Sequence, residues 1–180
     1  MSHALNTKAS NAFFQRPSVA KFNAIQQLVF ASSDYDPAAE SVTEIEQQLR
    51  HANPGRLLRR LEQLSCEFDI CPRMHYVEAR LRESLGEVDL MQQSIKRLQI
   101  CLEMIAETGE GSRDSPFVVT FVTDMDDTVR SFGEKVRYQQ PVLSKLGQFD
   151  VLTSHSGIEF WFDVSELARV RNLREEVTKA

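Results

Sequence analysis

The sequence has few cysteines, no long apolar run and no excess of basic residues. Only three of its 180 residues are cysteine and none forms a C-x-x-C pair, so neither a disulfide framework nor a zinc site is expected. No window approaches the roughly 18 consecutive apolar residues of a membrane-spanning helix. The formal net charge of −5 lacks the surplus of lysine and arginine that neutralises nucleic-acid phosphates. We therefore predict a globular cytoplasmic protein with neither nucleic-acid nor membrane partners.

Acidic residues are also missing from the first 33 positions, which carry Lys8, Arg16 and Lys21. An acid-poor start can be a targeting segment, but this one has neither an apolar signal region nor a dense arginine pattern. The alternative is a polar arm over residues 1–18 that leads into the first helix. We favour the arm and leave the targeting interpretation open.

Residues 19–107 predict helices, because apolar side chains recur there at spacings of three and four. Pro37 is expected at the first turn of the second helix, Pro72 at the start of the fourth, and Gly86 at its end. Asp89 is expected to cap the fifth helix. The five expected helices are Val19–Ala31, Ala38–His51, Arg56–Phe68, Pro72–Leu85 and Asp89–Ile105.

Part of this helical pattern repeats. Leu57, Leu61 and Leu64 recur 34 residues later as Met91, Ile95 and Leu98. A helix–turn–helix period of about 34 residues is that of tetratricopeptide (TPR) repeats. The alternative is a plain antiparallel helical bundle, since two helix pairs are fewer than repeat proteins usually need.

Residues 108–180 predict a different structure. The β-branched and aromatic run Phe117–Val122 predicts a strand, and Asp126–Phe132 a short helix closed by a glycine. Gln148–Thr153 and Ile158–Val164 flank a four-residue loop and predict a hairpin. Ser165 is expected to cap a last helix that ends near Val177. The order predicts an α+β fold, with TPR-like helix hairpins, a small antiparallel sheet and a C-terminal helix in one continuous domain.

The run Asp124–Thr128 resembles the D-x-D-x-T nucleophile loop of haloacid-dehalogenase-type phosphatases. There the first aspartate attacks phosphorus, the second handles the proton of the leaving group, and Mg²⁺ neutralises charge. Only 52 residues follow Thr128, however, too few for the crossover helices of the parallel sheet that supports this chemistry. The alternative is that Asp124 or Asp126 caps a helix. A carboxylate facing a cleft would favour chemistry, and one bonded to backbone N–H groups would favour the cap.

Just before that run, Thr108–Ser112 followed by Ser115–Val119 resembles the signature of an uncharacterised, mainly bacterial family, domain of unknown function 4919. Its members run helical repeats into a T-G-D-G-x-S turn and a strand, and the resemblance covers roughly residues 20–165. Glu110 stands here for the usual aspartate, and Asp127 for an aromatic residue. The signature positions, for which we expect structural roles, are Gly109, Gly111, Ser112, Pro116, Phe117, Gly133, Asp150, Phe162 and Asp163. The resemblance implies an order of elements and no mechanism.

Each remaining candidate has a structural interpretation. Both glycines of the signature turn are expected at positive φ. The three cysteines are expected to be buried free thiols. Surface or capping roles are expected for the scattered histidines, which are His3, His51, His75 and His155. A basic cluster can dock an acidic peptide, but nearby carboxylates can neutralise it. The cluster comprises Arg50, Arg56, Arg59 and Arg60, and its possible counter-ions are Glu44, Glu46 and Glu62.

Two functions from different classes follow. The first is a non-catalytic interaction or scaffold module, in which TPR-like helices bind a protein or peptide partner without a cofactor or metal. The second is a small Mg²⁺-dependent phosphohydrolase that uses Asp124 and Asp126. We favour the first. The sequence predicts neither the partner nor the oligomeric state.

Overall fold

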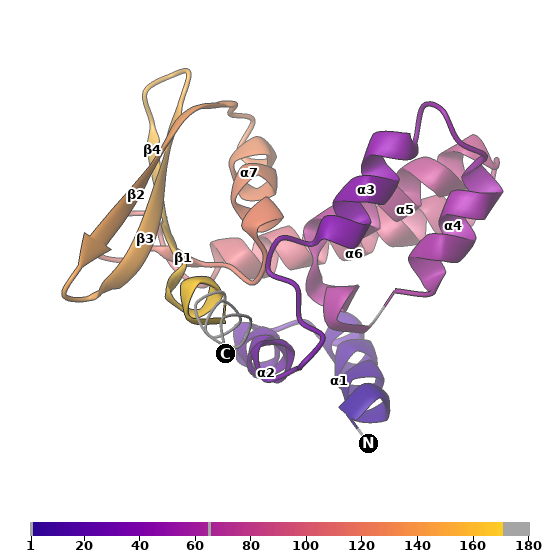
Figure 1. The fold of residues 1–180 in the computed structure, drawn as a ribbon, viewed down its shortest axis with the longest axis horizontal. Coiled ribbons are helices and arrows are strands. Elements are labelled where there is room, and N and C mark those ends of the chain that lie inside the picture. Colours follow the sequence, from indigo (N-terminus) through magenta and orange to yellow (C-terminus); the bar gives the residue numbers. More distant parts are fainter. Residues whose placement is uncertain (1, 65, 171–180) are drawn as a thin grey trace, which may run out of the picture.

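The computed structural model describes residues 2–64 and 66–170, with side chains from residue 9 onward. A body of helices occupies one side of the molecule and a small sheet the other, with helix α7 between them (Figure 1). The α+β class predicted from the sequence is confirmed.

The expected N-terminal arm is instead helical over most of its length. Helix α1 spans Ser2–Gln15 and α2 spans Val19–Phe30, so the predicted first helix is the second one observed. Phe13 of α1 is fully buried against Phe22 of α2. The Lys21 ammonium donates to the Ala12 and Arg16 carbonyls at 3.1 and 2.7 Å and so stabilises the end of α1. The burial of one aromatic side chain thus makes a segment of low overall hydrophobicity part of the core.

Four helices and a 3₁₀ turn follow: α3 (Glu40–Gln48), α4 (Pro54–Glu62), η1 (Cys66–Ile70), α5 (Pro72–Ser84) and α6 (Val88–Ala106). The expected start of α5 at Pro72 and the positive φ of Gly86 after it are confirmed. Helix α3 begins later than expected because the Asp36 carboxylate accepts from the N–H groups of Ala38 and Glu40, which holds that stretch in a turn. Glu87, not Asp89, is the N-cap of α6.

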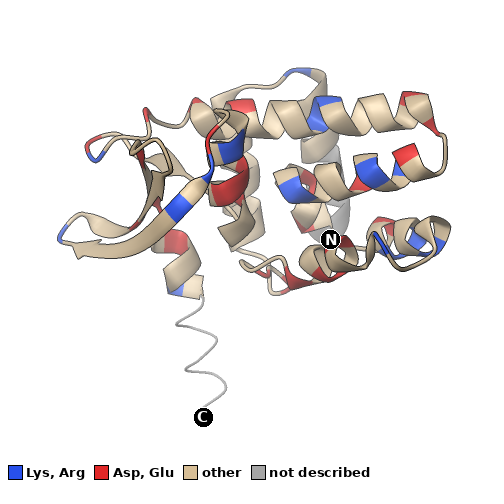
Figure 2. Ribbon diagram, turned by 90° about the horizontal axis from the view of Figure 1, so that it is seen from above, with Lys and Arg blue, Asp and Glu red and all other residues tan. Residues whose placement is uncertain are grey.

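Among these helices, α5 contacts the other three, most extensively α6, and α3 also contacts α4. Seen from above, α6 and α5 run side by side, with α3 and α4 on the opposite side of α5 (Figure 2). Helix α6 is therefore the outer layer of this stack.

The sheet has the order β1-β4-β3-β2. Its strands are β1 (Phe117–Val118), β2 (Val136–Ser144), β3 (Gly147–Ser154) and β4 (Glu159–Asp163), and α7 (Val122–Ser131) lies between β1 and β2. The predicted hairpin is β3–β4, and β2 is a strand that the sequence did not predict. The sheet is mixed rather than wholly antiparallel, because β1 runs parallel to β4. A last helix begins at residue 165, and its expected continuation to Val177 lies outside the described residues.

The helical and sheet regions share one core. The Phe121 ring, just before α7, stacks on Phe68 of η1 and meets Tyr35 edge-on, with ring centroids 5.6 and 5.7 Å apart. Thr120 is fully buried; its hydroxyl accepts from the Gln26 amide at 3.0 Å and its carbonyl from the Tyr35 hydroxyl. Residues far apart in the chain therefore hold the start of α7 against the helices.

Candidate functional site

The Asp124–Thr128 run lies in the first turns of α7 and not at the end of a strand. Strand β1 ends at Val118, and α7 begins at Val122, four residues earlier than expected. Asp124 is fully buried, and its Oδ2 accepts from the backbone N–H groups of Thr120 and Phe121, both at 2.9 Å. The carboxylate thus satisfies backbone donors at the start of a helix. The structure supports the predicted capping role, with Asp124 in the first turn rather than at the N-cap.

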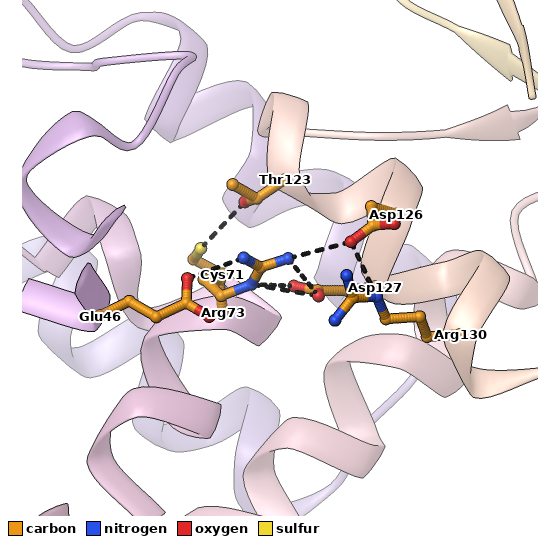
Figure 3. A network of polar contacts seen from close by, with 7 residues as sticks. All are labelled: Glu46, Cys71, Arg73, Thr123, Asp126, Asp127 and Arg130. Atoms are coloured by element: carbon orange, nitrogen blue, oxygen red, sulfur yellow. Dashed lines mark hydrogen bonds and ion pairs between the residues drawn. The ribbon is translucent and has the colours of Figure 1, made fainter. Parts of the chain in front are cut away.

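Asp126 and Asp127 belong to a charge network around Arg73 of α5 (Figure 3). The Arg73 Nε lies 3.0 and 3.1 Å from the two Asp127 oxygens, and its Nη2 lies 2.6 Å from Asp127 Oδ1. The same guanidinium reaches Glu46 of α3 at 2.8 Å and Asp126 at 3.4 Å. Arg130 completes the network, 2.9 Å from Asp126. One side chain therefore joins α3, α5 and α7.

This network is largely shielded from solvent, since the side chains of Arg73 and Asp127 are only 13% and 12% exposed. Burial raises the pKa of Asp127, Arg73 opposes that shift, and the carboxylates of Asp126 and Glu46 add to it. Burial lowers the pKa of Arg73, but its bonds to Asp127 and Glu46 outweigh that effect and the net shift is upward. The guanidinium stays charged in either case, so the network holds a fixed cation among three carboxylates.

The phosphatase interpretation needs two carboxylates that face a substrate and a metal ion. Asp124 faces backbone N–H groups inside the core, and Asp127 faces Arg73. Among the described residues, no group of three or more histidine, cysteine, aspartate or glutamate side chains could hold a metal ion. The geometry of α7 therefore gives no support to the phosphohydrolase alternative.

Asp124 makes stability depend on pH. Burial raises its pKa to about 8, against the two backbone hydrogen bonds, whereas an unfolded chain has a value of about 4. Below about pH 4 the group is protonated in both states; as pH rises toward 8 the unfolded state ionises first and stability falls. We expect this loss to be on the order of several kcal/mol, at about 1.4 kcal/mol per pKa unit.

Asp124→Asn should abolish that part of the pH dependence, because its amide oxygen can accept the same two hydrogen bonds without ionising. The measurement is the free energy of urea unfolding at several pH values between 4 and 8. Glu159→Gln, which removes an exposed carboxylate, is the matched control. Equal slopes for Asp124→Asn and the wild type would contradict the argument.

The signature turn before β1 is a compact loop held by its own backbone. Gly111 has a φ of 69°, as expected, but Gly109 does not have a positive φ. Gly109 is instead a point of close approach: a Cβ there would lie 2.2 Å from the Pro116 carbonyl oxygen. Ser112 closes the loop by accepting from the Ser115 N–H, and the Phe117 ring is buried against Phe162. Each of these positions has a structural role.

The other signature positions also lie in structural contacts. Gly133 ends α7 with a φ of 79°. The half-buried carboxylate of Asp150 accepts from the Gln139 amide across β2 and β3 at 3.0 Å. Asp163 Oδ1 accepts from the Ser165 N–H at 2.9 Å, so Asp163 caps the last helix in place of the expected Ser165. The structure does not gather these residues into one cleft.

The expectation for the three cysteines is confirmed: Cys66, Cys71 and Cys101 are buried thiols that form no disulfide bond. Burial raises the pKa of both Cys71 and Cys101, so these thiols stay protonated. His75 is not a surface residue, since it is 2% exposed and its Nε2 donates to the Asp69 carbonyl at 2.7 Å. His51 and His155 are exposed, and the side chain of His3 lies outside the described part.

The basic cluster has fewer carboxylate partners than the sequence suggests. Glu44 pairs with Arg60, but Glu46 pairs with Arg73 and Glu62 with Arg82. Two of the three possible counter-ions therefore pair with arginines of α5 rather than with the cluster. Arg56 and Arg59 are exposed on α4, and Arg50 is exposed in the turn between α3 and α4.

An apolar groove of about 540 Å³ lies beneath the outer half of the β2–β3 hairpin. Four separate parts of the chain line it, namely the Pro37–Ala38 turn, the start of α7, the hairpin and the helix at 165–170. Its walls are mainly apolar side chains, among them Val122, Met125, Leu143, Val164 and Leu167. No sequence pattern pointed to this groove, because no single segment carries more than a few of its residues.

The hairpin beside the groove is basic and exposed. Lys135, Arg137 and Lys145 are exposed there, whereas the carboxylate of Asp150 on β3 is half-buried and accepts from the Gln139 amide. The chain as a whole has a net charge of −5. Leu143 and Leu146 near its tip are 78% and 89% exposed. A second, smaller hollow of about 240 Å³ shares Val142 and Phe149 with the groove and includes Lys145, Leu146 and Trp161. Apolar and basic groups thus surround the tip of the hairpin.

Comparison with known proteins adds no relative from which a function could be carried over. No family model matches this chain, and neither the curated proteins nor the solved structures include a significant match. The described helices include none that is long and apolar enough to cross a membrane. The function must therefore be argued from the groove, the hairpin and the charge network.

Proposed function

We propose that the protein is a non-catalytic interaction module that binds an extended, acidic segment of another protein at the β2–β3 hairpin. The groove beneath the hairpin carries this proposal, because it is apolar, open at the surface and large enough for a bulky side chain. TPR-like packing of α3–α6, membership of the family named above and a cytoplasmic location remain part of the proposal. The helices serve here as the support for the hairpin, and the groove replaces the helical surface expected from the sequence.

The position of β2 favours an extended ligand. This strand ends the sheet order, so its outer backbone edge is unpaired within the described residues. Exposed edges accept a further strand, but Pro141 in the middle of β2 has no N–H to donate. Backbone pairing is therefore restricted, and an apolar side chain of the ligand in the groove should supply most of the affinity.

The charge of the hairpin favours an acidic ligand. Lys135, Arg137 and Lys145 lie along the strand and at its tip, where they attract carboxylates and repel basic segments. Because these cations are exposed, their contribution should weaken as salt rises.

The test is selection of a randomised peptide library, displayed on phage, against the full chain. We expect enriched peptides to combine acidic residues with a bulky apolar anchor and to bind more weakly at high salt. Leu143→Asp should weaken a selected peptide at least about tenfold, because it puts a charge in the groove wall. Leu146→Asp is the matched control: it adds the same charge three residues away, at a side chain outside the groove.

Fluorescence anisotropy with a labelled selected peptide measures these affinities. A library that yields no enrichment over an unrelated protein would refute the proposed function. Equal affinities of the two leucine variants would place the binding surface elsewhere.

A further inference from the structure

Helix α6 carries an apolar stripe that the fold of one chain leaves uncovered. Five apolar residues recur along it at spacings of three and four. This heptad spacing is typical of helices that pair with another helix. We call the set the α6 stripe; its members are Val88, Met91, Ile95, Leu98 and Leu102.

The fold buries a different face of α6. Its buried residues are Ser94, Ile100, Cys101, Met104 and Ile105, none of which belongs to the stripe. The stripe lies beside that face, with Val88 and Ile95 exposed to 56% and 36%. The other three stripe residues are half-buried and lie outside the cluster of described side chains that forms the core. The spacing of the stripe residues predicts that they are buried, but the fold of one chain does not bury them in its core.

The place of α6 in the stack makes this exposure unusual. The end helices of stacked helix pairs normally present a polar face to solvent. Here α6 is the outer layer beyond α5 (Figures 1 and 2), and its stripe begins with Val88, which is 56% exposed. Contiguous apolar surface of this kind marks an interaction site.

We infer that the α6 stripe is the contact between two copies of this chain in an antiparallel, two-fold dimer. The last four stripe residues, from Met91 to Leu102, are spaced by four, three and four positions, so the spacing is the same in both chain directions. A two-fold axis between positions 96 and 97 therefore places Met91 against Leu102 of the second copy and Ile95 against Leu98. Such a self-complementary patch suits an isologous contact.

The residues that flank the stripe allow this pairing. Gln92 and Gln99 border it on the solvent side and carry no charge, so two copies meet without repulsion at the positions that usually select a partner. Arg97 points away from the stripe, over the Phe14 ring of α1 at 5.3 Å. The contact from Met91 to Leu102 is only about 17 Å long, at about 1.5 Å per residue, so we expect a weak dimer that dissociates on dilution.

The test is the molar mass of the full chain by sedimentation equilibrium from about 1 to 300 μM, a range that spans weak and moderate dimers. We expect the mass to rise from the monomer value of 20.6 kDa toward twice that value. Ile95→Glu should raise the dissociation constant by about 30-fold or more. Gln93→Glu, which adds the same charge on another face of α6, should leave it unchanged. Circular dichroism and thermal unfolding show whether each variant is folded.

A double variant tests the orientation. With Ile95→Glu and Leu98→Lys in the same chain, each new glutamate faces a new lysine of the other copy only if the helices are antiparallel, so dimerisation should return. A monomer mass over the whole concentration range would overturn the inference. A dimer unaffected by Ile95→Glu would do the same, and a double variant that stays monomeric would overturn the antiparallel pairing. None of these results depends on the peptide groove, which lies on the hairpin.

Discussion

Arg73→Ala is expected to lower the free energy of unfolding by about 3–5 kcal/mol, because it leaves the carboxylate of Asp127 buried without its counter-ion. Glu46 and Asp126 lose the same partner, so three carboxylates then repel one another across α3 and α7. Urea unfolding at neutral pH measures the change. Arg60→Ala is the matched control, since its pair with Glu44 is 43% and 58% exposed and should contribute less than about 1 kcal/mol.

A double variant separates the loss of the pair from the cost of an unpaired charge. Arg73→Met combined with Asp127→Leu removes both charges and fills the space with apolar atoms, so it should recover most of the stability. If Arg73→Ala were no more destabilising than Arg60→Ala, the network would not join the helices as described. If the double variant were less stable than Arg73→Ala, the pair itself would contribute more than the unpaired charge costs.

Gly109→Ala is expected to destabilise the protein by about 3 kcal/mol or more, because the added methyl group meets backbone atoms that cannot move aside independently. Its Cβ would lie 2.2 Å from the Pro116 carbonyl oxygen and 2.8 Å from the Ser115 carbonyl oxygen. Relief requires the loop to open, which disturbs the Glu110 N–H bond to the Ser115 carbonyl at 2.8 Å. Thermal unfolding of the two proteins measures the effect.

Gly55→Ala is the control for this substitution. Gly55 lies in the first turn of α4, where the nearest atom to an added Cβ is Asn53 Oδ1 at 3.4 Å and the φ is not positive. Alanine should there be neutral or stabilise by up to about 1 kcal/mol, through the lower entropy of the unfolded chain. Equal effects at the two glycines would show that the close approach at Gly109 does not constrain the loop.

The elements that the sequence predicts well have local signals at their ends. Pro72 starts α5, Gly86 ends it, and the short loop after Ser154 defines the β3–β4 hairpin. Strand β2 has no such signal, because most of its side chains are exposed and Pro141 interrupts it. Pro141 is compatible with a strand here only because β2 is at the edge of the sheet.

The site was less predictable than the fold, for a physical reason. Asp124 caps α7 as expected, but the early start of α7 depends on Gln26 and Tyr35, which hold Thr120 from 94 and 85 residues away. The sequence around Arg73 gives no sign of its partner, and only the folded chain brings Asp127 to it from 54 residues away. The groove is assembled from four segments in the same way. Local sequence patterns carry no information about contacts between residues so far apart in the chain.

The anchoring of Thr120 also sets an order of events during synthesis. Gln26 and Tyr35 leave the ribosome long before Thr120 does. Because synthesis adds about 5–20 residues per second, several seconds pass before Thr120 is available to bond with them. During that interval the fully buried ring of Tyr35 has no Phe121 to pack against, and the helices made first have an open side. The helical half should therefore reach its final packing only once the strands have emerged, and a nascent chain that stalls before residue 120 should be a substrate for chaperones.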